Sequence, residues 1–384
     1  MERPDAHGRL HPLALCGKPG HQPDTPPVVG SLTEFRACRV VEDKTQTSYA
    51  HAMLRVEAVA RRVWSTVPPG VATSRVARRA RHTVLTLLHG EPPPTQRIIT
   101  TLDELDGMMK QLDAAGLVSD DELRRGFTTF RMELDVTMPP DPFSAEYHQA
   151  VMDQYAWLHG APYELVNEHT PFDVQRAIDT PFPYVTRSGP TVGNHLIAVG
   201  HVIRTLALPP GSRVLEFGPG WGNTTLALAQ MGHQVTAIDC SQEFVDLIQA
   251  RAALVHADVH TILGDFSAVR DLEGPFDAVL FFESFHHCTD HLGLLAALDR
   301  VVAPGGRVLF AAEPIDPQFY VPWGLRLDGE SLWAIRRNGW FELGFRPSYF
   351  LEALRRNGWS AEEVNCPASP WGDILVARRT SEAA

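Results

Sequence analysis

The stretch VLEFGPGWGNTTLALAQMG, residues 214–232, decides the fold. A short apolar run ends in an acid, Glu216, and leads into a turn that contains Gly218, Gly220 and Gly222. An alanine- and leucine-rich helical pattern follows the turn. Glycine lets a backbone turn tightly against a ligand because no Cβ blocks the approach, and the N-terminus of the next helix offers free N–H groups. The stretch therefore predicts a strand, a ligand-binding turn and a helix, although dinucleotide-binding and purely structural turns share this glycine spacing.

Strands and helices alternate on the carboxyl side of this stretch. Apolar runs predict strands at 214–217, 235–238, 278–282 and 307–312. Helical patterns lie between them, near 223–231, 242–251 and 292–302. This alternation is typical of the doubly wound parallel sheet of an α/β protein. Two further strands, at 359–365 and 373–379, are separated by a turn so short that we expect an antiparallel hairpin.

The first half of the chain has a helical character. Residues 1–30 are rich in Pro, Gly and His without periodicity and are expected to be disordered. Residues 31–142 predict an all-helical N-terminal domain of about four helices, the last running from Ser119 through Leu134. Such a domain most simply serves packing or homodimerisation. A more specific alternative is that it covers and recognises the substrate. Residues 143–210 predict a helical connector or cap before the sheet.

Composition limits the class of protein. The chain has 384 residues, enough for two domains, and its 44% hydrophobic and 21% charged content is that of an ordinary soluble protein. Neither a bilayer-spanning run of ~20 apolar residues nor an apolar signal core is visible, so a cytoplasmic location is expected. The net charge of −12 argues against nucleic acid or an anionic membrane as the main partner. Five scattered cysteines without a CxxC pair predict reduced thiols and no cysteine-built zinc site.

Three acids follow predicted strands at the edge where an open parallel sheet binds its ligand. Glu216 ends the first strand, Asp239 ends the second, and Asp265 follows the short run HTILGDF. The carboxylate of Asp239 can accept both hydroxyl hydrogens of a ribose, and that of Asp265 can accept from the amine of adenine. Glu216 is badly placed for a pyrophosphate but suits an ammonium group. The acids therefore fit a ligand with adenosine, an amino-acid ammonium and a sulfonium better than a dinucleotide.

Five motifs follow one another in order between about 210 and 380. They are ExGxGxG at 216–222, Asp239, Gly264-Asp265, FDAVLFFESFHH at 276–287 and VVAPGGRVLFAAEP at 301–314. Together they resemble the class I S-adenosylmethionine-dependent methyltransferases. The resemblance implies S-adenosylmethionine as cofactor and a Rossmann-like, seven-stranded sheet in a catalytic domain at 211–384.

The same resemblance implies a set of cofactor contacts. They are Glu216, Gly218, Gly220, Gly222, Asp239, Asp265, Phe266, Phe282 and Glu283. The glycines would line the methionine and ribose, Asp239 would hold the ribose hydroxyls, and Asp265 with Phe266 would meet the adenine. The backbone around Phe282 and Glu283 would flank the sulfonium. The sequence leaves two alternatives for each of two aromatic residues. Trp221 either stacks on the ligand or packs over the loop, and Tyr184 either folds over the cofactor or belongs to an ordinary connector.

The segment ESFHHCTDH, residues 283–291, carries the candidate reactive groups. Its ExxHHxxD pattern is similar to that of small-molecule and sugar O-methyltransferases, in which a histidine of the pair acts as base. A base promotes the in-line displacement by removing the proton of an alcohol acceptor. His286 or His287 is the candidate base, and Glu313, after the next strand, is the candidate carboxylate that orients its ring.

Two alternatives for the histidine pair stay open. One ring of such a pair can merely bond backbone. A metal site made of His286, His287, Asp290 and His291 is the other alternative. Neighbouring ligands rarely converge on an ion without groups from elsewhere, and no second cluster is visible, so no metal is predicted.

The stretch FYVPWGLRLDGESLWAIRRNGWFELGF, residues 319–345, follows the fifth strand, where we expect a substrate-covering insertion. Its candidate substrate-binding residues are Trp323, Arg326, Trp333 and Trp340. Aromatic faces beside charged groups suit a polar ring such as a sugar, or an aromatic acceptor. Alternatively, the tryptophans dock the insertion on the helical domain.

The predicted function is methyl transfer from S-adenosylmethionine to a hydroxyl of a sugar, a glycan precursor or a glycosylated secondary metabolite. One alternative is an N- or C-methyltransferase of another small molecule. Another is a non-catalytic S-adenosylmethionine-binding scaffold whose helical domain binds a partner, and a dinucleotide oxidoreductase comes third. The expected partner is a small-molecule acceptor, with a homodimer through the N-terminal domain left open.

Overall fold

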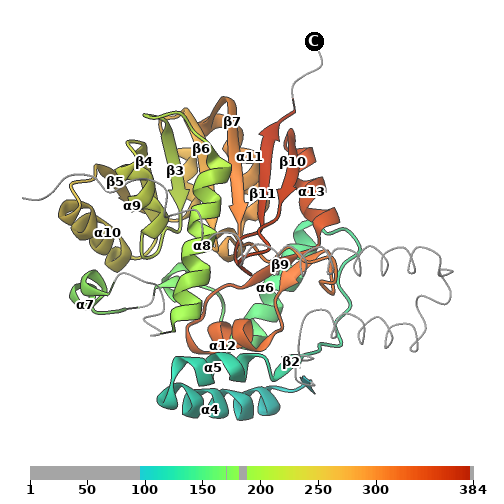
Figure 1. Cartoon of the computed structure of the whole chain (residues 1–384). Helices are drawn as coiled ribbons and strands as arrows, with labels where there is room; N and C mark the ends of the chain where they lie inside the picture. Colours follow the sequence, from blue (N-terminus) through green and yellow to red (C-terminus); the bar gives the residue numbers. More distant parts are fainter. Residues whose placement is uncertain (1–95, 170, 181–187, 381–384) are drawn as a thin grey trace, which may run out of the picture. The chain divides into compact units, whose positions relative to one another are not determined.

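The computed structural model describes residues 96–169, 171–180 and 188–380 (Figure 1). They belong to one compact unit, Pro93–Ala384. The predicted segment 1–30, the part of the N-terminal domain before residue 96, and Tyr184 lie outside the described residues.

The centre of this unit is a mixed sheet of seven strands in the order β10-β11-β7-β6-β3-β4-β5. In chain order the strands are β3 (Arg213–Phe217), β4 (Gln234–Asp239), β5 (Val259–Leu263), β6 (Phe276–Phe282), β7 (Val302–Ala311), β10 (Trp359–Val364) and β11 (Ile374–Arg379). The first five are parallel, whereas β11 runs antiparallel to β7 and to β10. The predicted Rossmann-like sheet and its C-terminal hairpin are thereby confirmed.

Helices cover both faces of the sheet, as the continuous apolar runs of its central strands require. On one face, α8 (Gly189–Leu206) and α9 (Asn223–Gln230) bury side chains against β3 and β6. On the other face, α11 (His291–Val301) and α13 (Pro347–Arg356) do the same, so that α8 lies in front of the sheet and α11 behind it in Figure 1. The helix α10 (Gln242–Leu254) packs on β4 and β5. None of the described helices has the length and apolar character needed to cross a bilayer.

The order of the strands reverses at β3, which pairs with β4 on one side and with β6 on the other. The connections after β3 and β6 therefore leave the sheet on opposite faces and separate at its carboxyl edge. Open α/β sheets bind their ligands in the crevice formed at such a switch point. The glycine-rich turn follows β3 and the histidine segment follows β6, so the fold brings both stretches to this crevice.

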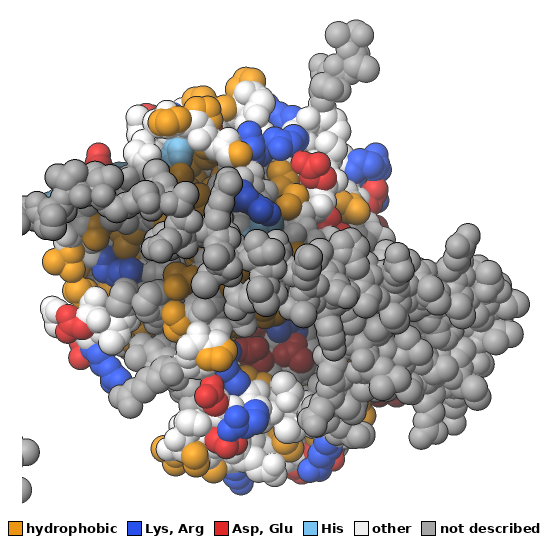
Figure 2. Space-filling model, in the orientation of Figure 1, with side chains coloured by type: hydrophobic (Ala, Val, Ile, Leu, Met, Phe, Trp, Pro, Cys, Tyr) orange, Lys and Arg blue, Asp and Glu red, His pale blue; other side chains and the backbone are white. Residues whose placement is uncertain are grey.

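The first described elements correct one prediction. They are β1 (Arg97–Ile99), α4 (Leu102–Val118), α5 (Asp120–Phe127) and β2 (Phe130–Met132). The helix expected to run from Ser119 through Leu134 ends at Phe127, because the hydroxyls of Thr128 and Thr129 bond carbonyls of its last turn. Phe130 then lies in a strand that pairs in parallel with β1, so the described part of this domain is not all-helical. The surface in the region of α4 and α5 carries both acidic and basic side chains among apolar and other ones (Figure 2).

The segment 319–345 forms β8 (Trp323–Leu325), α12 (Gly329–Arg337) and β9 (Leu343–Phe345). It packs on helices that precede the sheet in sequence, chiefly α5 and α6 (Ala145–His159). The guanidinium of Arg336 illustrates the contact, because it holds the carboxylate of Asp106 on α4 and two backbone carbonyls at the end of α6. The insertion is therefore joined to the helices that precede the sheet by packing and by hydrogen bonds.

Candidate functional site

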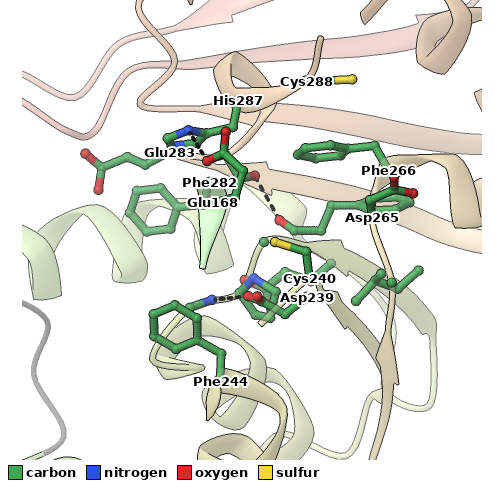
Figure 3. Close-up of a pocket in the computed structure, with 18 of the residues that line it drawn as sticks. Glu168, Asp239, Cys240, Phe244, Asp265, Phe266, Phe282, Glu283, His287 and Cys288 are labelled. Carbon is green, nitrogen blue, oxygen red and sulfur yellow. Dashed lines mark hydrogen bonds and ion pairs between the residues drawn. The ribbon is translucent and has the colours of Figure 1, made fainter. Parts of the chain in front are cut away.

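A cavity of about 380 Å³ opens at the carboxyl edge of β3, β4 and β6 (Figure 3). Its walls are the turn after β3, the ends of β4 and β5, and the segment after β6, completed by residues from other parts of the chain: Tyr163, Leu165, Glu168, His195 and Trp340. Most of the predicted cofactor contacts line it, namely Glu216, Gly218, Gly220, Asp239, Asp265, Phe266, Phe282 and Glu283. Gly222 does not.

The three glycines of the turn after β3 have positive φ angles and different tasks. A Cβ on Gly218 would lie 2.6 Å from that of Ser284, so glycine lets this turn approach the segment after β6. A Cβ on Gly222 would lie 2.7 Å from Ile248 Cγ1, so this glycine allows α10 to pack against the start of α9. A Cβ on Gly220 would meet no atom within 4 Å, and this glycine borders the open cavity. Gly222 is thus explained by packing.

Asp239 connects the end of β4 to the glycine turn. Its Oδ2 accepts from the backbone N–H of Gly220 at 3.2 Å and its Oδ1 from that of Ser241 at 2.9 Å. Burial raises the pKa of this carboxyl to about 6, against the opposing effect of the two backbone donors. Each oxygen keeps a lone pair for a further donor, so the ionised group can accept both hydroxyls of a ribose.

One carboxylate oxygen of Glu216 and one of Asp265 accept hydrogen bonds from within the protein. Burial raises the pKa of Glu216 to about 7, and its Oε2 accepts from the hydroxyl of Thr225 at 2.5 Å. The Oδ1 of Asp265 accepts from the backbone N–H of Ser267 at 2.9 Å and caps the short helix η4 (Phe266–Arg270). In each carboxylate the second oxygen accepts from no described residue, which leaves it available to a ligand.

The ring of His286 is held by Glu313. Its Nδ1 lies 2.8 Å from Glu313 Oε2, and the same carboxylate accepts from the backbone N–H groups of Ser284, Phe285 and His286. Burial would raise the pKa of Glu313, but His286 and the backbone donors hold it below its usual value. An ionised carboxylate can only accept, so Nδ1 of His286 carries a proton and donates it to Glu313. Glu313 thus lies where an orienting carboxylate was predicted.

His287, in contrast to His286, lines the cavity (Figure 3). Its Nδ1 lies 3.2 Å from Oε2 of Glu168, close enough for an ion pair although the alignment is not that of a hydrogen bond. Burial lowers the pKa of His287, but Glu168 and Glu342 more than offset this and raise it to about 9. At neutral pH the ring is therefore an imidazolium that donates to a ligand and cannot accept a proton.

Glu168 was not among the sequence candidates. It ends the short 3₁₀ helix η2 (Leu165–Glu168), far from the histidines in sequence. Nothing in the surrounding letters LVNEHT marks it as functional, since its role depends on a long-range contact.

The four-residue metal set considered from sequence does not assemble. The Nε2 of His291 lies 2.8 Å from the hydroxyl of Tyr349, and burial lowers the pKa of this histidine to about 3. Asp290 caps α11 through the backbone N–H of Gly293. His291 thus belongs to the core under the sheet, away from the cavity lining.

Of the four predicted substrate-binding residues, only Trp340 lines the cavity. Trp323 is 1% exposed and donates from Nε1 to the carbonyl of Pro142 at 2.7 Å. Trp333 packs its ring 5.6 Å from that of Phe127. Arg326 is paired with two carboxylates of the insertion itself. Trp323 and Trp333 therefore dock the insertion, as the alternative interpretation expected, whereas Trp340 lies at the cavity wall.

The two kinds of tryptophan should respond differently to replacement by alanine. We expect Trp323→Ala to lower the free energy of unfolding by about 3–5 kcal/mol, the cost of emptying a buried aromatic site. Trp340→Ala should leave that free energy within about 1 kcal/mol of wild type, since its ring is partly exposed at the cavity wall. Urea titration of both variants tests this, and equal losses would contradict the assignment.

Residues 214–306 match the family of methyltransferase domains. The chain is 28% identical over 178 residues to a ubiquinone biosynthesis O-methyltransferase of Xanthomonas campestris pv. campestris, a match that covers 45% of this chain and 64% of that protein. It is 30% identical over 190 residues to a protein-L-isoaspartate O-methyltransferase of Methylorubrum populi, which covers 49% of this chain and 80% of that protein. The solved magnesium protoporphyrin IX methyltransferase of Synechocystis PCC 6803, with bound S-adenosylhomocysteine, is 18% identical with a TM-score of 0.38, over 56% of this chain and 91% of that one.

The ubiquinone relatives are matched over less than two thirds of their own length, whereas the isoaspartate relative is matched over most of it. The region matched by the family contains nearly all of β3, the strands β4, β5 and β6, the glycine turn and the acids that line the cavity. The chain belongs to the class I S-adenosylmethionine-dependent methyltransferases, whose cofactor is S-adenosylmethionine.

Proposed function

We propose that the chain transfers the methyl group of S-adenosylmethionine to a hydroxyl of a small polar molecule: a sugar, a glycan precursor or a glycosylated metabolite. One observation carries this proposal. A single cavity joins the acids suited to the cofactor to a second wall made of Glu168, His287 and Trp340. The first wall accounts for the methyl donor and the second for a polar acceptor.

On the cofactor wall, Asp239 would accept the ribose hydroxyls and the turn at Gly218 and Gly220 would follow the methionine. Asp265 and Phe266 would hold the adenine. Glu216 would stay near the amino-acid ammonium, whose positive charge would favour the ionised carboxylate. Each of these groups lines the cavity, and the carboxylates keep unused oxygens there.

On the acceptor wall, carboxylates lie beside an aromatic ring. Trp340 packs its ring edge-on to His287 at 6.0 Å. Glu283 lines the same wall with a φ of 51°, and burial raises the pKa of its carboxyl to about 7. An aromatic face with hydrogen-bond acceptors around it suits a ring that carries several hydroxyls. This pairing of groups supports the sugar-like acceptor class.

The reaction is an in-line displacement: a carbon–oxygen bond forms as the carbon–sulfur bond breaks, and S-adenosylhomocysteine leaves. The acceptor must also lose its proton. We assign that proton to the carboxylate of Glu168, which lines the cavity beside the imidazolium of His287. His286, held by Glu313, would support this pair from behind.

One observation favours a second candidate, methyl transfer to nitrogen or carbon. His287 is an imidazolium at neutral pH, and an imidazolium cannot take the proton of a hydroxyl. An amine that binds as a free base needs no such acceptor in the transition state.

Purified protein with S-adenosylmethionine and a panel of glycosides, sugar nucleotides, phenols and amines tests the proposal. Mass spectrometry should find a methyl ether on a sugar-containing acceptor together with S-adenosylhomocysteine. Methylation confined to amines or carbon acids would support the second candidate instead. Binding of S-adenosylhomocysteine without turnover on any acceptor would favour the non-catalytic scaffold.

Affinity for S-adenosylhomocysteine should fall as pH decreases through about 6. The ribose needs the ionised form of Asp239, which is complete above its pKa of about 6 and is lost below it. Each pH unit below the pKa then weakens binding about tenfold, so pH 5 should give about tenfold weaker binding than pH 7. Calorimetry in a Glu216→Gln, Glu283→Gln background, which removes the two other raised carboxyls of the cavity, should show this step, and the same background with Asp239→Asn should lack it.

A further inference from the structure

We propose that the chain binds one divalent transition-metal ion between His286, His287 and Glu342. One ligand atom from each of these residues lies within 4.8 Å of the others, a spacing that a single ion can bridge. The Nε2 of His286 and the Oε2 of Glu342 are 3.8 Å apart. Both residues are only 6% exposed, so the polar atoms meet in the interior and not on the surface.

The two imidazoles are oriented as metal ligands are. Glu313 holds Nδ1 of His286, and Glu168 lies beside Nδ1 of His287. A carboxylate on one ring nitrogen fixes the tautomer and leaves the other nitrogen as ligand, which is the usual outer partner of metal-bound histidine. Glu313 is itself fixed by three backbone N–H groups, so this outer partner cannot turn away.

The cluster also has an excess of buried negative charge. Three carboxylates, those of Glu168, Glu313 and Glu342, surround the two imidazoles. The nearest guanidinium, Arg326, contacts Glu342 only through Oε2 and is shared with Asp328. Buried carboxylates are costly unless paired, and a divalent cation would compensate them. The Oε1 of Glu342 accepts from no described residue and remains open to such an ion.

The ligands converge because they come from different parts of the chain. The 3₁₀ helix η5 (Phe285–His287) places the two neighbouring rings with their centroids 4.3 Å apart. Glu342 enters from the insertion, directly before β9. Neighbouring histidines alone would rarely converge on an ion, and the insertion supplies the third group that the histidine segment lacks.

Two imidazoles and one carboxylate suit zinc and its neighbours among the divalent metals, whereas magnesium prefers oxygen ligands only. Methyl transfer moves no electrons between substrate and metal, so a zinc-like Lewis acid fits better than a redox ion. His287 lines the cavity, so the ion would border the acceptor and lower the pKa of its hydroxyl. Glu168 would then take the proton. This role rests on the proposed function, whereas the binding of the ion does not.

Cobalt titration of the full-length protein tests the site. Tag-free protein is stripped with a chelator, dialysed and titrated with Co²⁺ in the absence of cofactor and acceptor. We expect the visible absorption of a protein-bound Co²⁺ to saturate at one ion per chain, to be displaced by Zn²⁺ and to resist Mg²⁺. Absence of saturable binding at this ratio would overturn the proposal.

Variants locate the ion. Glu342→Gln and His286→Ala should each weaken Co²⁺ binding at least tenfold, and Glu313→Gln should weaken it about 10–100-fold through the orientation of His286. Glu352→Gln, on the exposed side of α13, is the matched control and should bind as wild type. Circular dichroism and affinity for S-adenosylhomocysteine show that each variant is folded. Wild-type Co²⁺ affinity in folded Glu342→Gln and His286→Ala would contradict the site.

The proposed metal site and the proposed function can be rejected independently of each other. Saturable Co²⁺ binding that depends on Glu342, together with no methylation of any hydroxyl, would support the site and reject the proposed acceptor class. Methylation of a sugar hydroxyl that survives chelation, by protein that binds no Co²⁺, would reject the site alone.

Discussion

Asp239→Ala should weaken binding of S-adenosylhomocysteine by about 100- to 1,000-fold. The substitution removes the carboxylate proposed to accept both ribose hydroxyls, and a hydrogen bond to a charged group contributes about 1.5–3 kcal/mol. Two such bonds near the lower end of that range amount to about 3–4 kcal/mol, and each 1.4 kcal/mol is a tenfold change in the dissociation constant. Calorimetric titration of wild type and variant measures the difference directly.

Asp239 also holds the backbone N–H groups of Gly220 and Ser241, so part of the loss would come from a loosened glycine turn. Asp239→Asn separates the two effects, because its amide oxygen can still accept one backbone donor while the charge is gone. We expect an intermediate affinity for this variant. Asp299→Ala, at an exposed carboxylate on α11, serves as the control. Binding by Asp239→Ala within threefold of wild type would remove this residue from the cofactor site.

The sheet and the cofactor wall were predictable because their signals are local. Central strands covered on both faces appear as uninterrupted apolar runs, and the acids of the cavity follow these runs directly. Glu216 is the last but one residue of β3 and Asp239 is the last residue of β4, so strand order alone brings them to the carboxyl edge. The glycine turn is equally local, because positive φ angles and close packing at Gly218 and Gly222 are properties of single positions.

Only some residues of the acceptor wall could be predicted from the sequence, because the residues of this wall meet through long-range packing. Glu168 ends a single helical turn and Glu342 precedes a three-residue strand, and neither neighbourhood has a periodicity that singles out one glutamate. The tryptophans of the insertion show the same limit. The sequence offers no way to distinguish Trp323 from Trp340. In the structure Trp323 is buried against α6, whereas Trp340 lines the cavity.

The end of α5 was missed for a related reason. Apolar residues at Phe127, Phe130 and Leu134 repeat at a helical spacing, so the pattern predicts one continuous helix. The hydroxyls of Thr128 and Thr129 compete for the last carbonyls and end the helix first. Met132 then donates its backbone N–H to Leu327 of the insertion at 2.8 Å, a contact that no local pattern shows.

His287→Ala should reduce turnover about 100- to 10,000-fold while affinity for S-adenosylhomocysteine stays within about threefold. His287 pairs with the carboxylate of Glu168 that takes the proton, and loss of a correctly positioned proton acceptor costs a factor in this range. The ring lies on the acceptor wall, beside Glu168 and Trp340, so its loss should affect the chemical step and not the adenosine end of the cavity. Single-turnover assays with S-adenosylmethionine and the best acceptor measure the rate, and calorimetry measures the affinity.

The matched control is His260→Ala, an exposed histidine on β5 that should leave both quantities unchanged. Glu168→Gln should lower turnover at least as much as His287→Ala, because it removes the carboxylate that accepts the proton. Both losses should be confined to hydroxyl acceptors, since a free amine needs no proton acceptor as it attacks. If His287→Ala keeps wild-type turnover on a hydroxyl acceptor, the proton leaves by another route and the assignment of this pair is wrong.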